Sequence, residues 1–262
     1  MTIDYKAILL VAGEGTRLRP YTLDRPKCMV EVDGISLLDR HLSVLRSDAR
    51  IKQMLMIGGY RADMLARPDV ALKLNPRFFE TNMVWTLFCA EEELSGNVVI
   101  CYGDIVYSPQ ILRALLDCPA DIAITVDKDW ESYWRARNED PLSDAETLKL
   151  RSDGSVYELG RKPRSLDEIE GQYMGLIKLS PCGAEILRGV FHAAKAKGEL
   201  GGKTIEKAYM TDLLQAVIDA GHTLQSVPIH GGWVEVDTVS DLQSEVTRER
   251  LANIPVSRVA TA

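Results

Sequence analysis

The stretch that decides the fold runs from Lys6 to Lys27 and reads KAILLVAGEGTRLRPYTLDRPK. It opens with an apolar run, Lys6–Val11, of the length and composition of a buried strand. Gly13 and Gly15 follow at once, and charged residues and prolines continue to Lys27. A buried strand that leads into a glycine-rich loop is a common phosphate site, because bare backbone N–H groups can approach phosphate oxygens. The stretch therefore predicts an α/β fold with an anion site at the end of its first strand.

The rest of the chain repeats this alternation of apolar runs and helical patterns. Ser36 can cap a helix that continues to about Arg46. Further strands are predicted at 54–57, 97–102, 121–126, 173–179, 223–229 and 233–236, and further helices at 82–94, 109–116, 184–197, 209–220 and from 239. This rhythm predicts a Rossmann-like fold with a mixed, mainly parallel sheet and helices on both faces.

The chain changes character at about residue 127. Residues 127–143 are polar and aromatic, and two alternating runs then flank Asp153-Gly154, which indicates a hairpin. We interpret residues 1–254 as a single domain with an inserted acceptor-binding and hairpin region at about 127–180. Residues 255–262 are expected to form a loose tail.

Composition excludes several classes of protein. The 262 residues are 46% hydrophobic and 26% charged, with a net charge of −7, so a basic nucleic-acid-binding surface is not expected. No apolar run approaches the roughly 18 residues of a membrane span, and no secretory signal is recognisable, so a cytoplasmic protein is expected. The five cysteines are widely spaced and lack a CxxC pair, which argues against zinc and disulfide frameworks. A monomer and a homodimer both remain open.

Several interpretations of the glycine-rich loop compete. A dinucleotide-binding fingerprint needs a third glycine where Leu18 stands, and Pro20 and Pro26 interrupt the helix that it requires. The complete Walker phosphate-binding motif is absent from the sequence. Gly201-Gly202-Lys203-Thr204 resembles only the end of that motif. A plain structural turn is the third alternative. The fourth is that Arg17, Arg19 and Lys27 converge on a triphosphate, for which an arginine fork and a lysine point charge are suited.

Residues 13–27 resemble the signature of the nucleotidyltransferases that activate sugar 1-phosphates and phospho-alcohols. That signature is G-x-G-T-R-L-x-P-x-T, a spacer and then P-K, and every fixed position is present. The resemblance implies that Arg17 and Lys27 are catalytic. It also implies a nucleotide site that includes Ala12, Gly13, Glu14, Gly15, Thr16, Gly59, Tyr60 and Asn82.

Later segments extend the resemblance to about residue 245. Tyr102-Gly103-Asp104 and the segment Trp233–Thr238 look like the two metal-binding segments of this family, which implies that Asp104 and Asp237 hold Mg²⁺. Glu206–Gly221 resembles the helix before the second of these. Gly160-Arg161-Lys162-Pro163 resembles the place where a second lysine, here Lys162, anchors the acceptor phosphate.

One part of the sequence indicates a branch of the family. Leu74-Asn75-Pro76, Thr81-Asn82 and Leu87 resemble the phosphocholine and phosphonate cytidylyltransferases, so CTP is the favoured nucleotide. Asn82 offers both a donor and an acceptor to a pyrimidine edge. It is equally suited to capping the helix that follows, and the two roles are compatible.

The acceptor site is predicted in the polar and aromatic region. Asp129, Trp130 and Tyr133, with Lys162, form the predicted acceptor-binding set, as a lid whose aromatic rings can cage a quaternary ammonium. Packing of these rings against the sheet is the other interpretation, and it is favoured over the cage for the aromatic residues themselves. Choline phosphate, an aminoalkyl phosphonate and a hydroxyalkyl phosphonate all remain open as acceptors.

The resemblance implies Mg²⁺-dependent nucleotidyl transfer from an NTP to a small phosphate or phosphonate, with release of pyrophosphate. Other functions stay open at this point: a sugar 1-phosphate nucleotidyltransferase using UTP, dTTP or GTP, a non-catalytic nucleotide-binding regulatory subunit, and, more distantly, an NAD-dependent oxidoreductase. The presence of Arg17, Lys27, Asp104 and Asp237 argues against a subunit that has lost catalysis.

Overall fold

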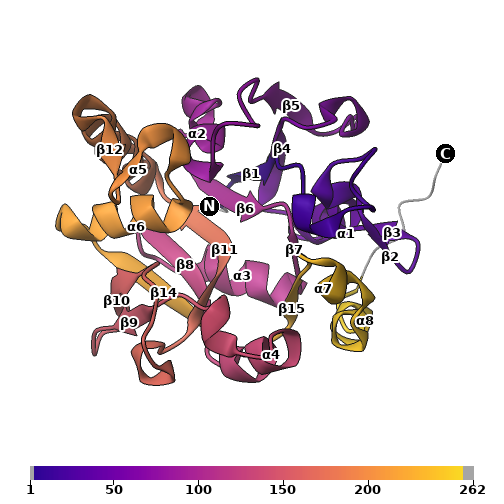
Figure 1. Ribbon diagram of the computed structural model, residues 1–262. Coiled ribbons are helices and arrows are strands. Elements are labelled where there is room, and N and C mark those ends of the chain that lie inside the picture. The colour runs from indigo at the N-terminus through magenta and orange to yellow at the C-terminus, as the bar shows by residue number, and fades with distance from the viewer. Residues whose placement is uncertain (1–2, 256–262) are drawn as a thin grey trace.

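Strand β1 (Tyr5–Val11) lies within a nine-stranded sheet in the computed structural model, which describes residues 3–255 (Figure 1). The strand order is β5-β4-β1-β6-β11-β8-β14-β10-β9. Only β10 and β11 run against the other strands of this sheet, which confirms the predicted mixed, mainly parallel arrangement. Besides β1, the sheet consists of β4 (Ile51–Gly58), β5 (Ala71–Leu74), β6 (Val98–Tyr102), β8 (Ile122–Asp127), β9 (Leu148–Leu150), β10 (Ser155–Leu159), β11 (Gln172–Leu179) and β14 (Leu224–Ile229).

Helices cover both faces of the sheet, as predicted. The described helices are α1 (Leu37–Arg46), α2 (Met83–Phe88), α3 (Pro109–Asp117), α4 (Trp130–Arg137), α5 (Pro181–Lys197), α6 (Met210–Asp219), α7 (Val239–Gln243) and α8 (Glu245–Ala252). Three short two-stranded ladders complete the fold: β2 (Glu31–Val32) with β3 (Ile35–Ser36), β7 (Ile105–Tyr107) with β15 (Trp233–Glu235), and β12 (Glu199–Leu200) with β13 (Lys203–Thr204).

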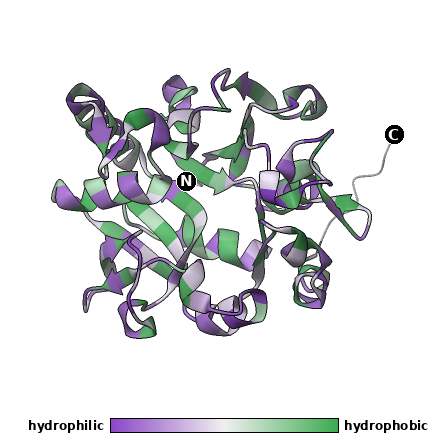
Figure 2. Ribbon diagram, viewed as in Figure 1, coloured by the Kyte–Doolittle hydropathy of each residue, from purple (hydrophilic) through white to green (hydrophobic). Residues whose placement is uncertain are grey.

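The alternation of side chains along β1 divides the core in two. Ala7, Leu9 and Val11 belong to one apolar cluster, which α1, α3 and α4 cover. Ile8 and Leu10 belong to the other, which α2, α5 and α6 cover. Successive strand residues point to opposite faces, so a strand buried on both sides must be apolar throughout. Figure 2 shows the central strands largely in the hydrophobic colour.

Local signals set several boundaries where the sequence predicts them. The Ser36 hydroxyl accepts a hydrogen bond of 3.0 Å from the Asp39 backbone N–H and caps α1. Helix α5 ends at Gly198, whose φ of 80° suits a residue without a Cβ. The helix predicted over 82–94 is shorter, because Ala90 leaves the helical conformation. This break lets Glu93 pair with Lys6 at 2.6 Å.

The region 127–180 contributes strands to the sheet itself. Its hairpin, β9 and β10, extends one edge, but its last strand, β11, lies at the centre between β6 and β8. The polar and aromatic part forms α4, which packs into the core. The predicted loose tail falls, except for its first residue, outside the described residues. Across residues 3–255, none of the helices has the length and apolar character needed to span a membrane.

Candidate active site

The glycine-rich loop that follows β1 has backbone N–H groups available for a ligand. Within residues 3–255, the backbone N–H groups of Gly13, Glu14 and Gly15 donate no hydrogen bond to the protein. The Thr22 hydroxyl donates to the Gly15 carbonyl oxygen at 2.8 Å and fixes the curve of the loop. Gly15 has a φ of 64°, and a Cβ built on it would stand 2.9 Å from the Lys27 Cβ. Free N–H groups on a fixed loop are the donors that phosphate oxygens need.

Lys27 reaches from this loop to two carboxylates. Its Nζ lies 2.7 Å from the Asp104 Oδ2 and 2.5 Å from the Asp237 Oδ1, and Arg17 pairs with the other oxygen of Asp237. Three distant parts of the chain therefore meet at one point. The predicted residues Arg17, Lys27, Asp104 and Asp237 all belong to this cluster.

The topology explains why the two carboxylates meet. Asp104 follows β6, the direct neighbour of β1. Asp237 follows β15, which pairs with β7 so that Glu235 lies opposite Ile105. The Val236 N–H also donates to the Asp104 carbonyl oxygen at 3.0 Å. Ligand sites of open α/β sheets lie beyond the carboxyl ends of the strands, and this cluster has that position.

Lys27 carries a firmly held charge. Burial opposes its charged form, but the carboxylates of Asp104 and Asp237 outweigh that effect and hold its pKa above the ordinary value. Its side chain is only 15% exposed. Because water barely reaches this cation, its electrostatic attraction for an anion placed beside it is strong.

The donor set at this point fits a magnesium ion. The Asp104 Oδ1 is buried and has no hydrogen-bond partner among residues 3–255. Mg²⁺ prefers oxygen ligands and is usually held by one or two carboxylates, with substrate phosphates and water completing its shell. Across these same residues no cluster of three or more His, Cys, Asp or Glu side chains is placed to hold a metal. Asp104 and Asp237 therefore suit an ion that arrives with a phosphate ligand.

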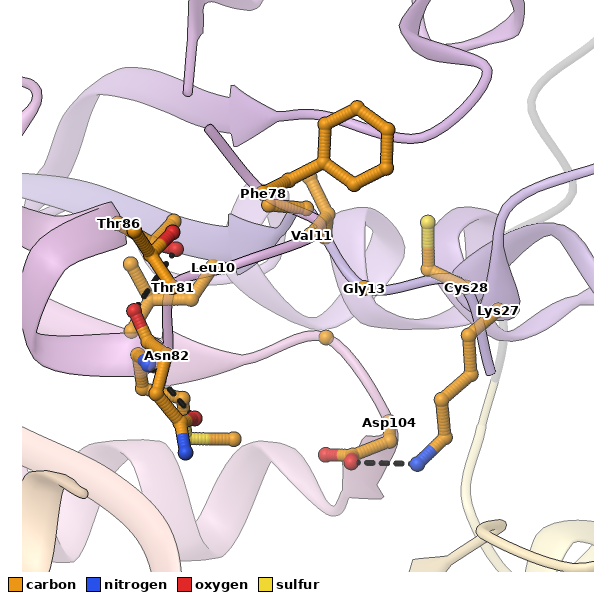
Figure 3. Close-up of a pocket in the computed structure, with 13 residues that line it drawn as sticks. Leu10, Val11, Gly13, Lys27, Cys28, Phe78, Thr81, Asn82, Thr86 and Asp104 are labelled. Atoms are coloured by element: carbon orange, nitrogen blue, oxygen red, sulfur yellow. Dashed lines mark hydrogen bonds and ion pairs between the residues drawn. The ribbon is translucent and has the colours of Figure 1, made fainter. Parts of the chain in front are cut away.

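A first pocket opens between the glycine-rich loop and α2 (Figure 3). Asn82 lies across it from Lys27 and Asp104. Its Oδ1 accepts from the Met83 N–H at 2.8 Å, which confirms the capping role, and its Nδ2 has no partner within the described part of the chain. The lining residues are Leu10, Val11, Ala12, Gly13, Lys27, Cys28, Phe78, Thr81, Asn82, Met83, Thr86, Gly103 and Asp104.

Asn75 holds one wall of the first pocket in place. It is fully buried, and its Nδ2 donates to the hydroxyls of Thr81 and Thr86 at 2.9 and 3.0 Å. Gly59 and Tyr60, predicted to bind nucleotide, do not line the pocket. They brace its floor instead, because the Tyr60 N–H donates to the Ala12 carbonyl oxygen at 3.1 Å. A Cβ on Gly59 would approach that same oxygen to 2.8 Å.

A second pocket adjoins the charged cluster and is acidic and aromatic. Gln172 fixes Glu146 there, donating to its carbonyl oxygen at 2.6 Å and accepting from its N–H at 3.3 Å. Glu146 is exposed as a residue, yet the surrounding protein and the charges of Asp212 and Asp144 raise the pKa of its carboxyl group to about 7. The lining residues are Arg17, Met83, Tyr102, Trp134, Asp144, Glu146, Gln172, Tyr173, Met174, Gly175, Tyr209, Thr211, Trp233, Glu235 and Asp237.

The predicted acceptor residues lie elsewhere. Trp130 and Tyr133 are 4% and 1% exposed and pack in the core. Asp129 pairs with His230 at the surface, and the Lys162 ammonium donates to backbone carbonyls of the 3₁₀ turn at Pro141–Ser143. None of the four lines either pocket; Trp134, from the same helix, does. Reasoning from sequence missed Asp144, Glu146 and Gln172, which come from separate segments without a shared motif. Tyr102 and Thr211 lie in segments that the family resemblance covers, but neither was singled out as a site residue.

Truncation of Trp130 therefore tests the packing alternative. We expect Trp130→Ala to lower the free energy of unfolding by about 3–5 kcal/mol, since it removes a buried ring that packs edge-on against Trp134. The KM of the folded enzyme for its acceptor should not change. Urea denaturation beside steady-state kinetics measures both quantities, with the exposed Tyr157→Ala as a control. A raised acceptor KM at unchanged stability would restore the lid hypothesis.

Comparison with known proteins agrees with this geometry. Residues 7–167 match the MobA-like NTP transferase domain, and the chain belongs to that family of enzymes. The chain is 37% identical over 253 residues to the CTP:phosphoglutamine cytidylyltransferase of Campylobacter jejuni, a match that spans 92% of this chain and 99% of the relative. The predicted family resemblance is thereby confirmed.

Two further proteins extend the comparison. The choline-phosphate cytidylyltransferase of Streptococcus pneumoniae is 33% identical over 99 residues, covering 36% of this chain and 43% of the relative. A solved structure of the CTP:phosphocholine cytidylyltransferase from that organism superposes with a TM-score of 0.73 at 21% identity, over 94% of this chain and 99% of the other. This last likeness confirms the fold.

Proposed function

We propose that this enzyme transfers the cytidylyl group of CTP to a small acceptor that bears a phosphate or phosphonate, with Mg²⁺ and release of pyrophosphate. The observation that carries the proposal is the position of Lys27, between Asp104 and Asp237 and beside a loop with free N–H groups. The cytidylyltransferase names of the relatives support the choice of nucleotide.

The reaction needs charge compensation more than proton transfer. An acceptor phosphate is largely a dianion near pH 7, since its second pKa is about 6. Its oxygen bonds to the α-phosphorus of CTP, the bond from that phosphorus to the bridging oxygen breaks, and pyrophosphate leaves with the electron pair. At about 4 Å, two unit charges repel by roughly 4 kcal/mol at an effective dielectric of 20. Positioning and electrostatic stabilisation must overcome this repulsion.

The residues of the charged cluster divide this work. Lys27 bridges the α-phosphate and the acceptor oxygen, and Arg17 attracts the negative charge of the departing phosphates. The loop N–H groups of Gly13 and Gly15 receive phosphate oxygens. Mg²⁺, held by Asp104 and Asp237, would neutralise phosphate charge and align the two substrates. Lys162 retains its proposed role as acceptor anchor only if it leaves the carbonyl oxygens of Leu142 and Ser143 when substrate binds.

The second pocket favours an acceptor with a positive group. Its lining holds the carboxylates of Asp144, Glu146 and Glu235 and several aromatic rings, a combination that suits an ammonium ion. The acceptors named for the two relatives are phosphoglutamine and choline phosphate. We therefore expect a small ammonium-bearing phosphate or phosphonate to be preferred over a hexose 1-phosphate. The five free thiols suit a reducing compartment such as the cytoplasm, which we propose as its location.

A nucleotide panel tests the proposed base. CTP should exceed UTP in kcat/KM by roughly 5- to 150-fold, the effect of leaving one buried polar group unpaired, about 1–3 kcal/mol. The free Nδ2 of Asn82 can donate to N3 of cytosine, where uracil carries N–H. Asn82→Asp keeps the helix cap but removes that donor, so discrimination should fall. Equal or higher kcat/KM with UTP, dTTP or GTP would show that the branch is misassigned.

The proposed function as a whole is tested by pyrophosphate release in a matrix of five NTPs against phospho- and phosphono-acceptors. Choline phosphate, aminoethylphosphonate, phosphoglutamine, a hydroxyalkyl phosphonate and glucose 1-phosphate form the minimum set. Turnover only with the sugar phosphate would establish the sugar-nucleotide alternative. Nucleotide binding without turnover on any acceptor would favour the regulatory subunit.

A further inference from the structure

Arg137 is the last residue of α4 and lies behind the wall of the second pocket. Its side chain is 6% exposed, and its guanidinium contacts two carboxylates at once. Nη1 lies 2.6 Å from the Glu235 Oε2, while Nε and Nη2 donate to the two oxygens of Asp241 at 2.9 and 3.2 Å. The cation also lies over the rings of Tyr133 and Trp134, at 5.2 and 5.4 Å from their centroids. Among residues 3–255, Arg137 makes no hydrogen bond or ion pair with the glycine-rich loop or with Lys27.

The two partners of Arg137 lie on either side of Asp237 in the chain. Glu235 ends β15, and its N–H donates to the Tyr133 hydroxyl at 3.0 Å. Asp241 is in the first turn of α7, and its Oδ2 accepts from the N–H of Asp237 at 3.1 Å and of Thr238 at 2.9 Å. Contacts of Glu235, before Asp237 in the chain, and of Asp241, after it, therefore fix the backbone of Asp237. The direct contact is made by Asp241, and Arg137 orients Asp241.

We propose that Arg137 is a positioning residue for nucleotidyl transfer, which places the Asp237 carboxylate where it can share a divalent cation with Asp104. The inference rests on the proposed function. It assigns a purpose to the aromatic helix α4 that differs from the predicted lid. Tyr133 and Arg137, one turn apart, brace the segment that carries Asp237.

Chemistry explains why an arginine stands here. Its planar fork can engage two carboxylates in fixed directions, whereas the ammonium of lysine is a point charge without a preferred plane. Groups that orient metal ligands from outside typically matter 10- to 100-fold for metal affinity. A residue that only stabilised the fold would not affect metal binding by the folded enzyme.

The test measures binding of CTP by isothermal titration calorimetry, with and without Mn²⁺ and without acceptor. The ratio of the two Kd values reports how much the cation strengthens nucleotide binding. We expect Arg137→Ala to reduce this ratio by up to about 100-fold and Arg137→Lys by about 10-fold, with little change in the metal-free Kd. Arg135→Ala, which removes an exposed arginine of the same helix, should leave the ratio unchanged.

Folding and function are separated by two further observations. The Tm of each variant shows whether it folds, and if Arg137→Ala does not, Arg137→Lys decides, since it keeps the charge beside Glu235 and Asp241. A folded Arg137→Lys with the ratio of the wild type would overturn the proposal. If the wild-type enzyme itself binds CTP no better with Mn²⁺, the proposed function fails instead.

Discussion

Replacement of Lys27 by alanine is expected to lower kcat by roughly 10²–10³, the scale of losing one group that stabilises charge in the transition state. Lys27 is the one side chain that contacts both Asp104 and Asp237 in the described structure, and it points into the first pocket. The loss should fall on kcat more than on the KM for CTP, since the bridging contact forms fully only as the two phosphates approach. Pyrophosphate release under saturating substrates measures it.

The stability of the same variant provides a second result. Without Lys27, Asp237 keeps Arg17 as an ion-pair partner and Asp104 keeps none among the described residues, so Mg²⁺ should raise the Tm of the variant more than that of the wild type. Lys52→Ala is the matched control, because Lys52 lies on β4 at the opposite end of the sheet and is exposed. Full activity of Lys27→Ala would refute the assigned role.

The two aspartates give the second large effect. We expect Asp104→Asn and Asp237→Asn each to lower kcat/KM by roughly 10²–10³, because each keeps the size of the side chain but removes one negative charge from the proposed metal site. The double variant should lose less than the product of the single losses, since both residues serve one ion. Steady-state assays over a range of Mg²⁺ concentrations measure the effect.

Removal of the metal complements these substitutions. EDTA should abolish turnover, and added Mg²⁺ should restore it. Asp63→Asn, an exposed aspartate outside both pockets, controls for a general effect of lost charge. Undiminished activity in EDTA, or losses in the double variant that multiply fully, would exclude a single shared cation.

The part of the site that the sequence predicts well is the part encoded in short contiguous segments. Lys27 belongs to the fifteen-residue loop signature, and Asp104 and Asp237 each follow a recognisable strand. The nearness of Asp104 to the glycine-rich loop also follows from a parallel sheet, because parallel strands bring their carboxyl ends to one edge; the order of the strands was not predicted. The second pocket is different: its walls come from several segments, and no local sequence pattern at Glu146 or Gln172 predicts the hydrogen bonds between them.

The misplaced lid has a more specific cause. Trp130, Tyr133, Trp134 and Arg137 stand at the i, i+3, i+4, i+7 spacing of one helix face, which is the pattern of a buried stripe. The charged residues between them make the segment polar on average. Its place just beyond a predicted strand end, with acids, aromatic rings and arginines together, suggested a lid over the acceptor. The burial of Trp130 shows that periodicity is the better guide here.

The two pockets draw on different halves of the chain, and this bears on how such enzymes diversify. Every residue that lines the first pocket lies between Leu10 and Asp104, whereas the second pocket takes all but Arg17, Met83 and Tyr102 from residues 134–237. Of the residues proposed to act on the nucleotide, Arg17, Lys27 and Asp104 thus lie in the first half and Asp237 in the second. An enzyme of this kind can acquire a new acceptor through substitutions in the second half alone, provided that the contacts of Asp241 and Arg137 that hold Asp237 in place are kept.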